Sequence, residues 1–473
     1  MNFNDYKIKN DPQTAAYKAL EKAKAVQGKL NAVVSYVDPQ ARLDELKEIE
    51  PNGKMHGIPI VLKDNVNTKG ILTTAGSRIL GNYIAQYDAT IVEKLNAAGA
   101  VLIAKSSLDE FGMGGTNLSA ATGPVYNPYD LSRMSGGSSG GSAVLVASGV
   151  VPFAIGSDTG DSVRKPASFN GVVGFKPTYG RISRYGIIPY ASSLDHVAFF
   201  TRNVADAATS LEVLAGRDDR DMTSLDLPVE PYRDRLNADL AGKKIGILTN
   251  VLDAIHDPEI LSMFNGLIAK LKERGAEIVE IEMNQDLLSA ILPTYYIIAN
   301  AEATANHSNL DGLRFGVQKD GDDVDEVMTN SRTAGFGKLI RKRFVIGSYA
   351  LFVENQDKLF RKAQKVRRLI VEDLKKALSE VDGLIAPAAA NVAPKLNDTS
   401  LDQLSSTYLI AENFMVMGNF SGCPSITVPL GYKDGLPVGV NLTCNLYDEQ
   451  TTLDLALAIE QATGLSDQIK EVA

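Results

Sequence analysis

Apolar positions along the first quarter of the chain follow a helical spacing in some segments and form short strand-like runs in others. Between residues 12 and 28 they recur every three or four positions, which predicts a helix opened by Asp11 and followed at once by proline. Apolar runs at 57–62 and 101–104 have the length of buried strands. A helix of residues 88–99, capped by its first residue, is predicted between them.

The same alternation continues through the rest of the chain. A strand at 245–248 precedes a helix that begins at Asp257 and ends before Gly275, and a strand at 278–281 follows. Further strands are predicted at 150–155, 384–386, 425–428 and 438–443. Helices that alternate with strands in this way are typical of an α/β fold.

Two stretches, 217–244 and 388–407, are polar, contain proline and have no clear periodicity. Neither has the composition of a domain linker, and the strands on both sides can belong to one sheet. We therefore predict a single α/β domain, residues 1–473, in which a mixed central sheet is covered by helices on both faces and these two stretches form surface excursions.

Composition and charge narrow the functional classes. The chain has 473 residues, 44% of them hydrophobic, and its 48 Lys and Arg against 57 Asp and Glu give a net charge of −9. An acidic chain of this kind is poorly suited to hold nucleic-acid phosphates by itself. Its two cysteines do not make a disulfide framework or a zinc cluster. No signal segment or membrane span is predicted, which favours a cytoplasmic protein.

One segment, residues 134–142, contains four glycines and four serines among nine residues. A flexible linker is one interpretation, but core-like sequence flanks the segment on both sides. A phosphate-binding loop is a second, but the Lys-Ser/Thr pair of a P-loop is missing. The third is a cramped backbone that needs glycine in order to place serine hydroxyls in a site.

A second polar segment, 156–166, follows the strand predicted at 150–155 and leads into a helix. Successive backbone N–H groups in such a turn can point to one spot and stabilise an oxyanion. Ser162 lies in this turn. It can be a nucleophile or simply a helix cap, and the pattern alone favours neither.

A serine nucleophile needs a base, and none of the four histidines of the chain has an obvious catalytic setting. Lys63 directly follows the apolar strand at 57–62. Such a lysine usually extends its ammonium into solvent. If it is buried instead, desolvation lowers its pKa, and a neutral Lys63 can act as a base near pH 7.

Taken together, these segments resemble the amidase signature family, and the resemblance runs over nearly the whole chain. The motifs that carry it are 57–65, 136–142, 156–162, 174–178 and 180–186. The resemblance implies an α/β amidase with a Ser–cis-Ser–Lys triad. Ser162 would be the nucleophile, Ser138 the bridging serine, entered through a cis peptide bond from Gly137, and Lys63 the base.

The resemblance also implies the groups around the triad. The oxyanion hole would be made by the backbone N–H groups of Thr159, Gly160, Asp161 and Ser162. The substrate would be bound by Ser139, Arg343 and Glu412, of which Arg343 matches a carboxylate-binding arginine and Glu412 an amino-binding aspartate. No metal is implied.

Within the family, segments 107–114 and 193–195 are similar to the glutaminase subunits of glutamyl-tRNA(Gln) amidotransferases. This similarity implies that the chain releases ammonia from glutamine for the conversion of glutamyl-tRNA(Gln) to glutaminyl-tRNA(Gln). It implies a heterotrimer in which the B-subunit binds ATP, Mg and most of the tRNA and the C-subunit is a small wrapping partner. No cofactor is expected in this chain.

The chain departs from the family pattern at two positions. Asp161 replaces a glycine that usually precedes the nucleophile, and Lys165 replaces a glutamine. Because a carboxylate near an oxyanion would repel it, we expect Asp161 to point away, held by Lys165 or Arg164. Two other functions stay open: a stand-alone amidase for another small amide, and a scaffold that Asp161 has disabled.

A last feature is the basic segment 338–376, which holds 12 Lys and Arg against 4 Asp and Glu. It can be a solvated helix face or a contact surface for tRNA or another subunit of the complex.

Overall fold

A computed structural model describes residues 3–48, 53–398, 405 and 407–472. Its centre is an 11-stranded sheet with the order β1-β3-β2-β4-β6-β5-β10-β11-β9-β7-β8. The strands are β1 Val33–Tyr36, β2 Pro59–Lys63, β3 Val101–Ser106, β4 Phe153–Asp158, β5 Val173–Lys176, β6 His196–Thr201, β7 Lys244–Leu248, β8 Glu277–Ile281, β9 Gly383–Pro387, β10 Ser425–Lys433 and β11 Leu436–Cys444.

The sheet is mixed. β2 is parallel to β3 and β4, and β7 is parallel to β8 and β9, whereas the strands between these two groups pair antiparallel. β5 pairs with β10 from the far end of the chain, so residues about 250 positions apart in sequence become neighbours, as Ser425 opposite Lys176 shows.

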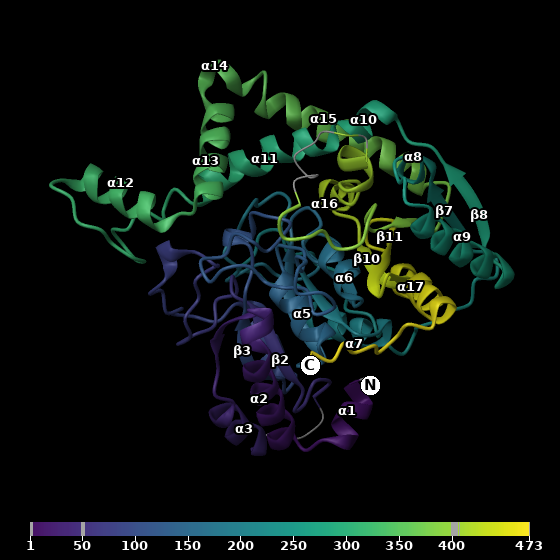
Figure 1. Cartoon of the computed structure of the whole chain (residues 1–473), viewed down its shortest axis with the longest axis horizontal. Helices are drawn as coiled ribbons and strands as arrows, with labels where there is room; N and C mark the ends of the chain where they lie inside the picture. The colour runs from purple at the N-terminus through teal and green to yellow at the C-terminus, as the bar shows by residue number, and fades with distance from the viewer. Residues whose placement is uncertain (1–2, 49–52, 399–404, 406, 473) are drawn as a thin grey trace.

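Helices surround the sheet (Figure 1). They are α1 Phe3–Lys9, α2 Pro12–Leu30, α3 Gln40–Lys47, α4 Thr90–Ala97, α5 Gly140–Ala147, α6 Arg164–Asn170, α7 Val204–Leu214, α8 Thr249–Asp253, α9 Pro258–Glu273, α10 Gln285–Ser289, α11 Ile291–Asn306, α12 Val324–Gly335, α13 Lys338–Leu351, α14 Val353–Gln356, α15 Phe360–Leu378, α16 Val416–Ser421 and α17 Glu449–Thr463. Short turns of other helix types lie at Arg78–Leu80, Glu110–Gly112 and Thr407–Ala411.

Both faces of the sheet are buried. In β2, Ile60 and Leu62 belong to one hydrophobic core and Val61 to the other, because successive side chains of a strand point to opposite faces. The core that contains Val61 is closed by residues of α2, α3 and α5, and the opposite core by residues of α4, α7 and α17. The predicted α/β sheet with helices on both faces is confirmed.

A layer built from α11, α13, α14 and α15 lies at one side of this body, and α12 projects away from it (Figure 1). α11 packs on both α13 and α15. The stretches 217–243 and 388–398 form no helix or strand, as expected of surface excursions, while part of 388–407 lies outside the described residues. None of the helices in the described ranges is both long and apolar enough to cross a bilayer.

Several predicted boundaries were wrong for local physical reasons. The first helix continues past Gly28 to Leu30, and Asn31 with φ 50° ends it in the left-handed conformation. Asp88 does not cap α4, because its carboxylate accepts a hydrogen bond from Lys69 N at 2.7 Å. β4 begins at Phe153 rather than at residue 150, because Val150 is still bonded to the end of α5. Its N–H donates a hydrogen bond to Leu145 O at 3.0 Å.

Candidate active site

Lys63 is the last residue of β2 and is fully buried. Its Nζ lies within hydrogen-bond distance of three serine hydroxyls: Ser138 Oγ at 2.8 Å, Ser139 Oγ at 2.9 Å and Ser157 Oγ at 2.9 Å. Burial lowers the pKa of Lys63 to about 7, although the carboxylates of Asp109 and two further aspartates favour the charged form. A substantial fraction of Lys63 is therefore a neutral amine near pH 7, with a lone pair that can accept a hydroxyl proton.

Ser138 follows a cis peptide bond from Gly137, as the family resemblance implies. The glycines of this segment are required because the backbone approaches its neighbours closely. A Cβ at Gly137 would lie 2.1 Å from Asp109 Oδ2, and one at Gly141 would lie 2.6 Å from Ser107 O. The segment is therefore a tightly packed backbone, and the linker interpretation is wrong.

The loop of residues 109–119 holds the backbone of the glycine-serine segment, and the sequence did not predict this role. Asp109 accepts hydrogen bonds from Asn117 N at 2.8 Å and Ser119 Oγ at 2.7 Å. Asn117 Oδ1 in turn accepts one from Gly140 N at 2.9 Å, at the start of α5. The motif 107–114 contains Asp109, but nothing in its spacing shows that the carboxylate folds the chain next to Ser138.

Ser162 lies in the turn between β4 and α6 and is 3% exposed. The N-cap residue of α6 is Val163, and the first N–H groups of the helix are bonded by Asp158 Oδ2, so the helix-cap interpretation of Ser162 is wrong. Ser139 N donates to Ser162 O at 3.2 Å, which ties the turn to the glycine-serine segment.

The backbone of the same turn offers free donors. In the described part of the chain, no acceptor bonds the N–H groups of Thr159, Gly160, Asp161 or Ser162. Buried N–H groups are normally paired, so four successive unpaired donors beside a buried serine are suited to stabilise an oxyanion.

A buried ion pair fixes the shape of this turn. Asp158 Oδ1 lies 2.9 Å from Arg164 Nη2, and Asp158 Oδ2 accepts from Val163 N at 2.9 Å. Asn419 Nδ2 donates to the same carboxylate at 2.9 Å. Burial opposes the ionisation of Asp158, but Arg164, the charge of Lys176 and the hydrogen bond from Val163 N outweigh it and hold its pKa below the usual range. Arg164 is thus bound to Asp158 and is not the partner of Asp161.

Lys165 is the partner of Asp161, which is one of the two arrangements expected from the sequence, the other being a pair with Arg164. Lys165 Nζ lies 3.3 Å from Asp161 Oδ2 and 2.8 Å from Glu412 Oε2. It also bonds the backbone oxygen of Glu412. Burial disfavours the ammonium, yet Glu412 and Asp161 together raise the pKa of Lys165. The link from Lys165 to Glu412 was not predicted.

Arg343, on α13, is 9% exposed and lies among tyrosines. Its Nη1 donates to Tyr190 OH at 2.7 Å, and its guanidinium lies 5.2 Å from the ring centre of Tyr296. Tyr295 packs on the turn, because a Cβ at Gly160 would lie 3.2 Å from Tyr295 Cζ. Sequence reasoning missed all three tyrosines.

Tyr295 connects Arg343 with Asp161. Its ring centre lies 6.4 Å from that of Tyr190, whose hydroxyl accepts from Arg343, and its ring approaches Gly160, the residue before Asp161. Arg343 and Asp161 therefore lie on one site, although almost two hundred residues separate them in sequence.

Ser139 is placed differently from the other expected substrate residues. Its hydroxyl is bonded to Lys63 and also donates to Ser157 O at 3.1 Å, and the residue is fully buried. Its side chain thus supports the base and strand β4, and its role in substrate binding stays a prediction.

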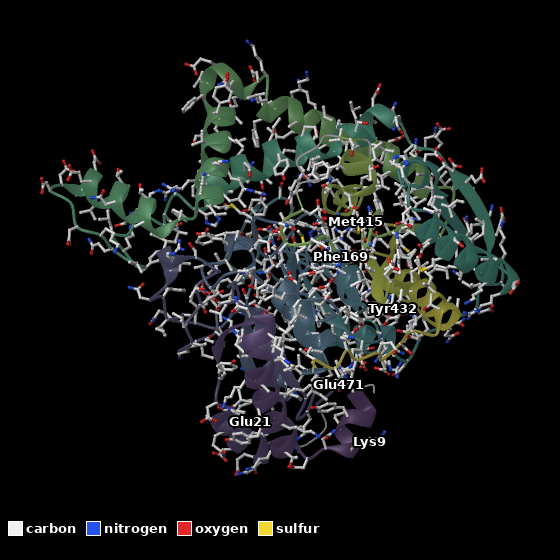
Figure 2. The ribbon with its side chains drawn as sticks, in the orientation of Figure 1. Lys9, Glu21, Phe169, Met415, Tyr432 and Glu471 are labelled. Carbon is white, nitrogen blue, oxygen red and sulfur yellow. The ribbon has the colours of Figure 1, made fainter. Side chains whose placement is uncertain are left out.

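Two cavities flank this centre. One of about 240 Å³ is lined by Asn65, Ser157 and Tyr190, among others, on the Lys63 side. One of about 360 Å³ is lined by Glu412, Tyr408 and Phe169, among others. Figure 2 shows Phe169, on α6, near the middle of the molecule.

Comparisons with known proteins agree with this geometry. A family model described as Amidase matches residues 15–453. The A-subunit of the glutamyl-tRNA(Gln) amidotransferase from Koribacter versatilis is 42% identical over 450 residues, which are 93% of this chain and 93% of that protein. The corresponding protein from Moorella thermoacetica is 40% identical, over 97% of this chain and 94% of that protein.

Solved structures are similar over the same length. The A-subunit of the glutamyl-tRNA(Gln) amidotransferase from Thermotoga maritima has a TM-score of 0.83 and 33% identity, covering 100% of this chain and 98% of that one. The peptide amidase from Stenotrophomonas maltophilia has a TM-score of 0.82 and 30% identity, covering 97% and 94%. The family match spans most of the chain, and we conclude that this protein belongs to the amidase family.

Proposed function

We propose that this chain is the glutaminase subunit of a tRNA-dependent amidotransferase, which releases ammonia from glutamine for the conversion of glutamyl-tRNA(Gln) to glutaminyl-tRNA(Gln). The observation that carries the proposal is the buried hydrogen bond between Lys63 and Ser138, at 2.8 Å, beside a turn that presents Ser162 and four free N–H donors. The names of the relatives at 40–42% identity support the assignment to an amidotransferase rather than to another amidase.

In the proposed acylation step, the neutral amine of Lys63 takes the proton of the Ser138 hydroxyl. Ser138 Oγ takes the proton of Ser162 as Ser162 Oγ forms a bond to the amide carbon of the glutamine side chain. The lysine pKa of about 7 suits this role, because a base works best when its pKa lies near the operating pH.

The N–H groups of Thr159 to Ser162 would bind the oxyanion of the tetrahedral intermediate. As this intermediate collapses, the proton held by Lys63 returns through Ser138 to the departing nitrogen, and ammonia leaves. Water then loses a proton to the same relay and attacks the acyl-enzyme, and glutamate and the free serine result.

The proposed complex contains two further chains. The B-subunit would bind ATP and Mg, activate the glutamyl group and hold most of the tRNA, and the C-subunit would wrap around the pair. The net charge of −9 on the present chain is in keeping with a protein that leaves the tRNA to its partners. Because the proposed acceptor is an aminoacyl-tRNA, we place the complex in the cytoplasm.

The test is to express the chain with candidate B and C partners and to measure ammonia released from glutamine, with and without ATP and glutamyl-tRNA(Gln). We expect a stable complex and ammonia release coupled to formation of glutaminyl-tRNA(Gln). Hydrolysis of other small amides without a partner would instead support a stand-alone amidase. A complex that forms but releases no ammonia would support a disabled scaffold.

A further inference from the structure

A substrate that carries an ammonium group, as glutamine does, needs a carboxylate that is free to receive it. Most acids around the nucleophile are already engaged. Asp158 is bound to Arg164, and Asp109 receives Asn117 N and Ser119 Oγ. Asp195 Oδ1 accepts from Thr159 Oγ1 at 2.7 Å, and its Oδ2 accepts from Tyr190 N at 2.8 Å.

Glu412 is engaged as well. Its Oε2 lies 2.8 Å from Lys165 Nζ, and its Oε1 accepts a hydrogen bond from Ala390 N at 2.8 Å. Both oxygens thus have partners, and the ammonium of Lys165 already neutralises the carboxylate. A substrate ammonium would have to displace a lysine that is only 8% exposed and held by three acceptor atoms.

Asp161 differs from these acids. Within the described ranges its only ion-pair contact is Lys165 at 3.3 Å, through Oδ2, and no donor bonds its Oδ1. Its side chain is 18% exposed, against 9% for that of Lys165. Asp161 also directly precedes Ser162 in the turn between β4 and α6, so it belongs to the segment that carries the nucleophile.

The charges of the site fit a zwitterion. Asp161, Lys165 and Glu412 together carry a net charge of −1, and Arg343, bonded to Tyr190 beside Tyr295, supplies a positive charge. An amino acid brings an ammonium, which balances the negative charge of Asp161, Lys165 and Glu412, and a carboxylate, which balances Arg343. An amide without an ammonium would leave the net negative charge uncompensated in a partly buried site.

We propose that Asp161 is the specificity-determining residue that binds the α-ammonium of the glutamine substrate, and that Lys165 is a built-in counterion that occupies Glu412. This inference rests on the proposed glutaminase function. It differs from the sequence-based expectation, in which Glu412 binds the amino group and Asp161 is only a residue to be turned away.

The test compares glutamine with glutaramate, which has the same amide and carboxylate but no ammonium. For the wild-type complex we expect kcat/KM to be at least about tenfold higher for glutamine, because only glutamine can make a charge-assisted hydrogen bond to Asp161. Asp161→Asn should raise KM for glutamine by about tenfold or more and lower the ratio of kcat/KM for glutamine to that for glutaramate towards one. Glu302→Gln, an acid-to-amide change on α11 that contacts Ser193 N, is the matched control and should change neither.

A double variant tests the role of Lys165. Asp161→Asn with Lys165→Gln restores a net charge of −1 at this position and frees Glu412. It should regain most of the preference for glutamine that Asp161→Asn loses. The proposal would be overturned if the preference for glutamine over glutaramate is equal in wild type and Asp161→Asn. It would also be overturned if the double variant does not regain that preference.

Binding separates this inference from the proposed function. Calorimetry on the Ser162→Ala protein, with and without Asp161→Asn, measures affinity for both compounds without turnover. A preference for glutamine that depends on Asp161 supports the inference even if the wild-type complex makes no ammonia. Ammonia release from glutamine with no such dependence leaves the function standing and contradicts the inference.

Discussion

Lys63 Nζ lies 2.8 Å from Ser138 Oγ, and both side chains are sealed from solvent, with exposures of 0% and 1%. Burial is what makes this contact useful. A solvated lysine keeps its proton at pH 7, whereas here desolvation brings the pKa to about 7. The fold creates the base by ending a strand that is buried on both faces with a lysine.

The first prediction concerns the pH dependence of the reaction. Because the base is active only when deprotonated, kcat/KM for glutamine should rise about tenfold per pH unit below pH 7 and level off above it. Lys63→Arg should lose about 10²–10⁴-fold in activity, as should Lys63→Ala, because a guanidinium does not release its proton. Initial rates of ammonia release between pH 5.5 and 9 check this. An arginine variant that keeps a tenth of the activity would show that the site uses positive charge rather than a base.

The second prediction concerns the nucleophile. Ser162→Ala should lower ammonia release by about 10³-fold or more, since the acyl-enzyme cannot form, while the thermal unfolding midpoint stays close to that of the wild type. Ser148→Ala is a matched control, because Ser148 is also buried and its hydroxyl donates to Val144 O of α5 at 2.7 Å, away from the turn that carries Ser162. Retained activity in Ser162→Ala would mean that another group attacks the amide.

The third prediction concerns the packing of the glycine-serine segment. Gly137→Ala places a methyl group 2.1 Å from Asp109 Oδ2 and 2.7 Å from Asn117 N, so the Asp109–Asn117 hydrogen bond must move. We expect a loss of about 1–3 kcal/mol in the free energy of unfolding and at least a tenfold lower kcat.

Gly115→Ala is the control for this variant. Gly115 O accepts from Gly137 N at 2.8 Å, yet no atom of the residues that the structure describes lies within 4 Å of a Cβ at Gly115. In urea unfolding and in glutaminase assays, Gly137→Ala should therefore be clearly less stable and less active than Gly115→Ala. Similar behaviour of the two would show that the close contacts at Gly137 are not what fixes Ser138.

Local chemistry explains which elements the sequence predicts well. The helices that begin after Asp11 and Asp257 start where predicted, because in both the aspartate accepts the first free N–H groups and proline follows. Asp88 also stands just before a helix, but alanine follows it, and a donor from another segment, Lys69 N, bonds its carboxylate. A cap is predictable only when no tertiary partner competes for it.

The candidate site divides in the same way. Lys63, Ser138 and Ser162 lie in motifs that identify them, and Lys165 lies one helical turn from Asp161, so a pair between them follows from spacing. Tyr190 and Tyr295 come from distant segments and carry no motif. The contact between Lys165 and Glu412 joins residues 247 positions apart, and only the folded sheet and its helices bring them together.

The fourth prediction concerns stability rather than catalysis. Glu460, at the end of α17, accepts a hydrogen bond from Val204 N at 2.9 Å and is 8% exposed. Burial, helped by the nearby carboxylates of Asp467 and Asp206, raises its pKa to about 7. The folded protein therefore keeps this proton at a pH where the unfolded chain has lost it, so stability falls as pH rises from about 4 to about 7 and then levels off.

Glu460→Gln removes this titration and keeps an oxygen that can accept from Val204 N. Its free energy of unfolding should equal that of the wild type near pH 4 and exceed it by about 1–3 kcal/mol above pH 7. Urea unfolding at pH 4.5, 6 and 8 measures this difference, with the exposed Glu273→Gln as a control that should show no such trend. A Glu460→Gln variant that is less stable than wild type at pH 8 would show that the folded protein stabilises the ionised carboxylate, which is opposite in sign to the expected effect.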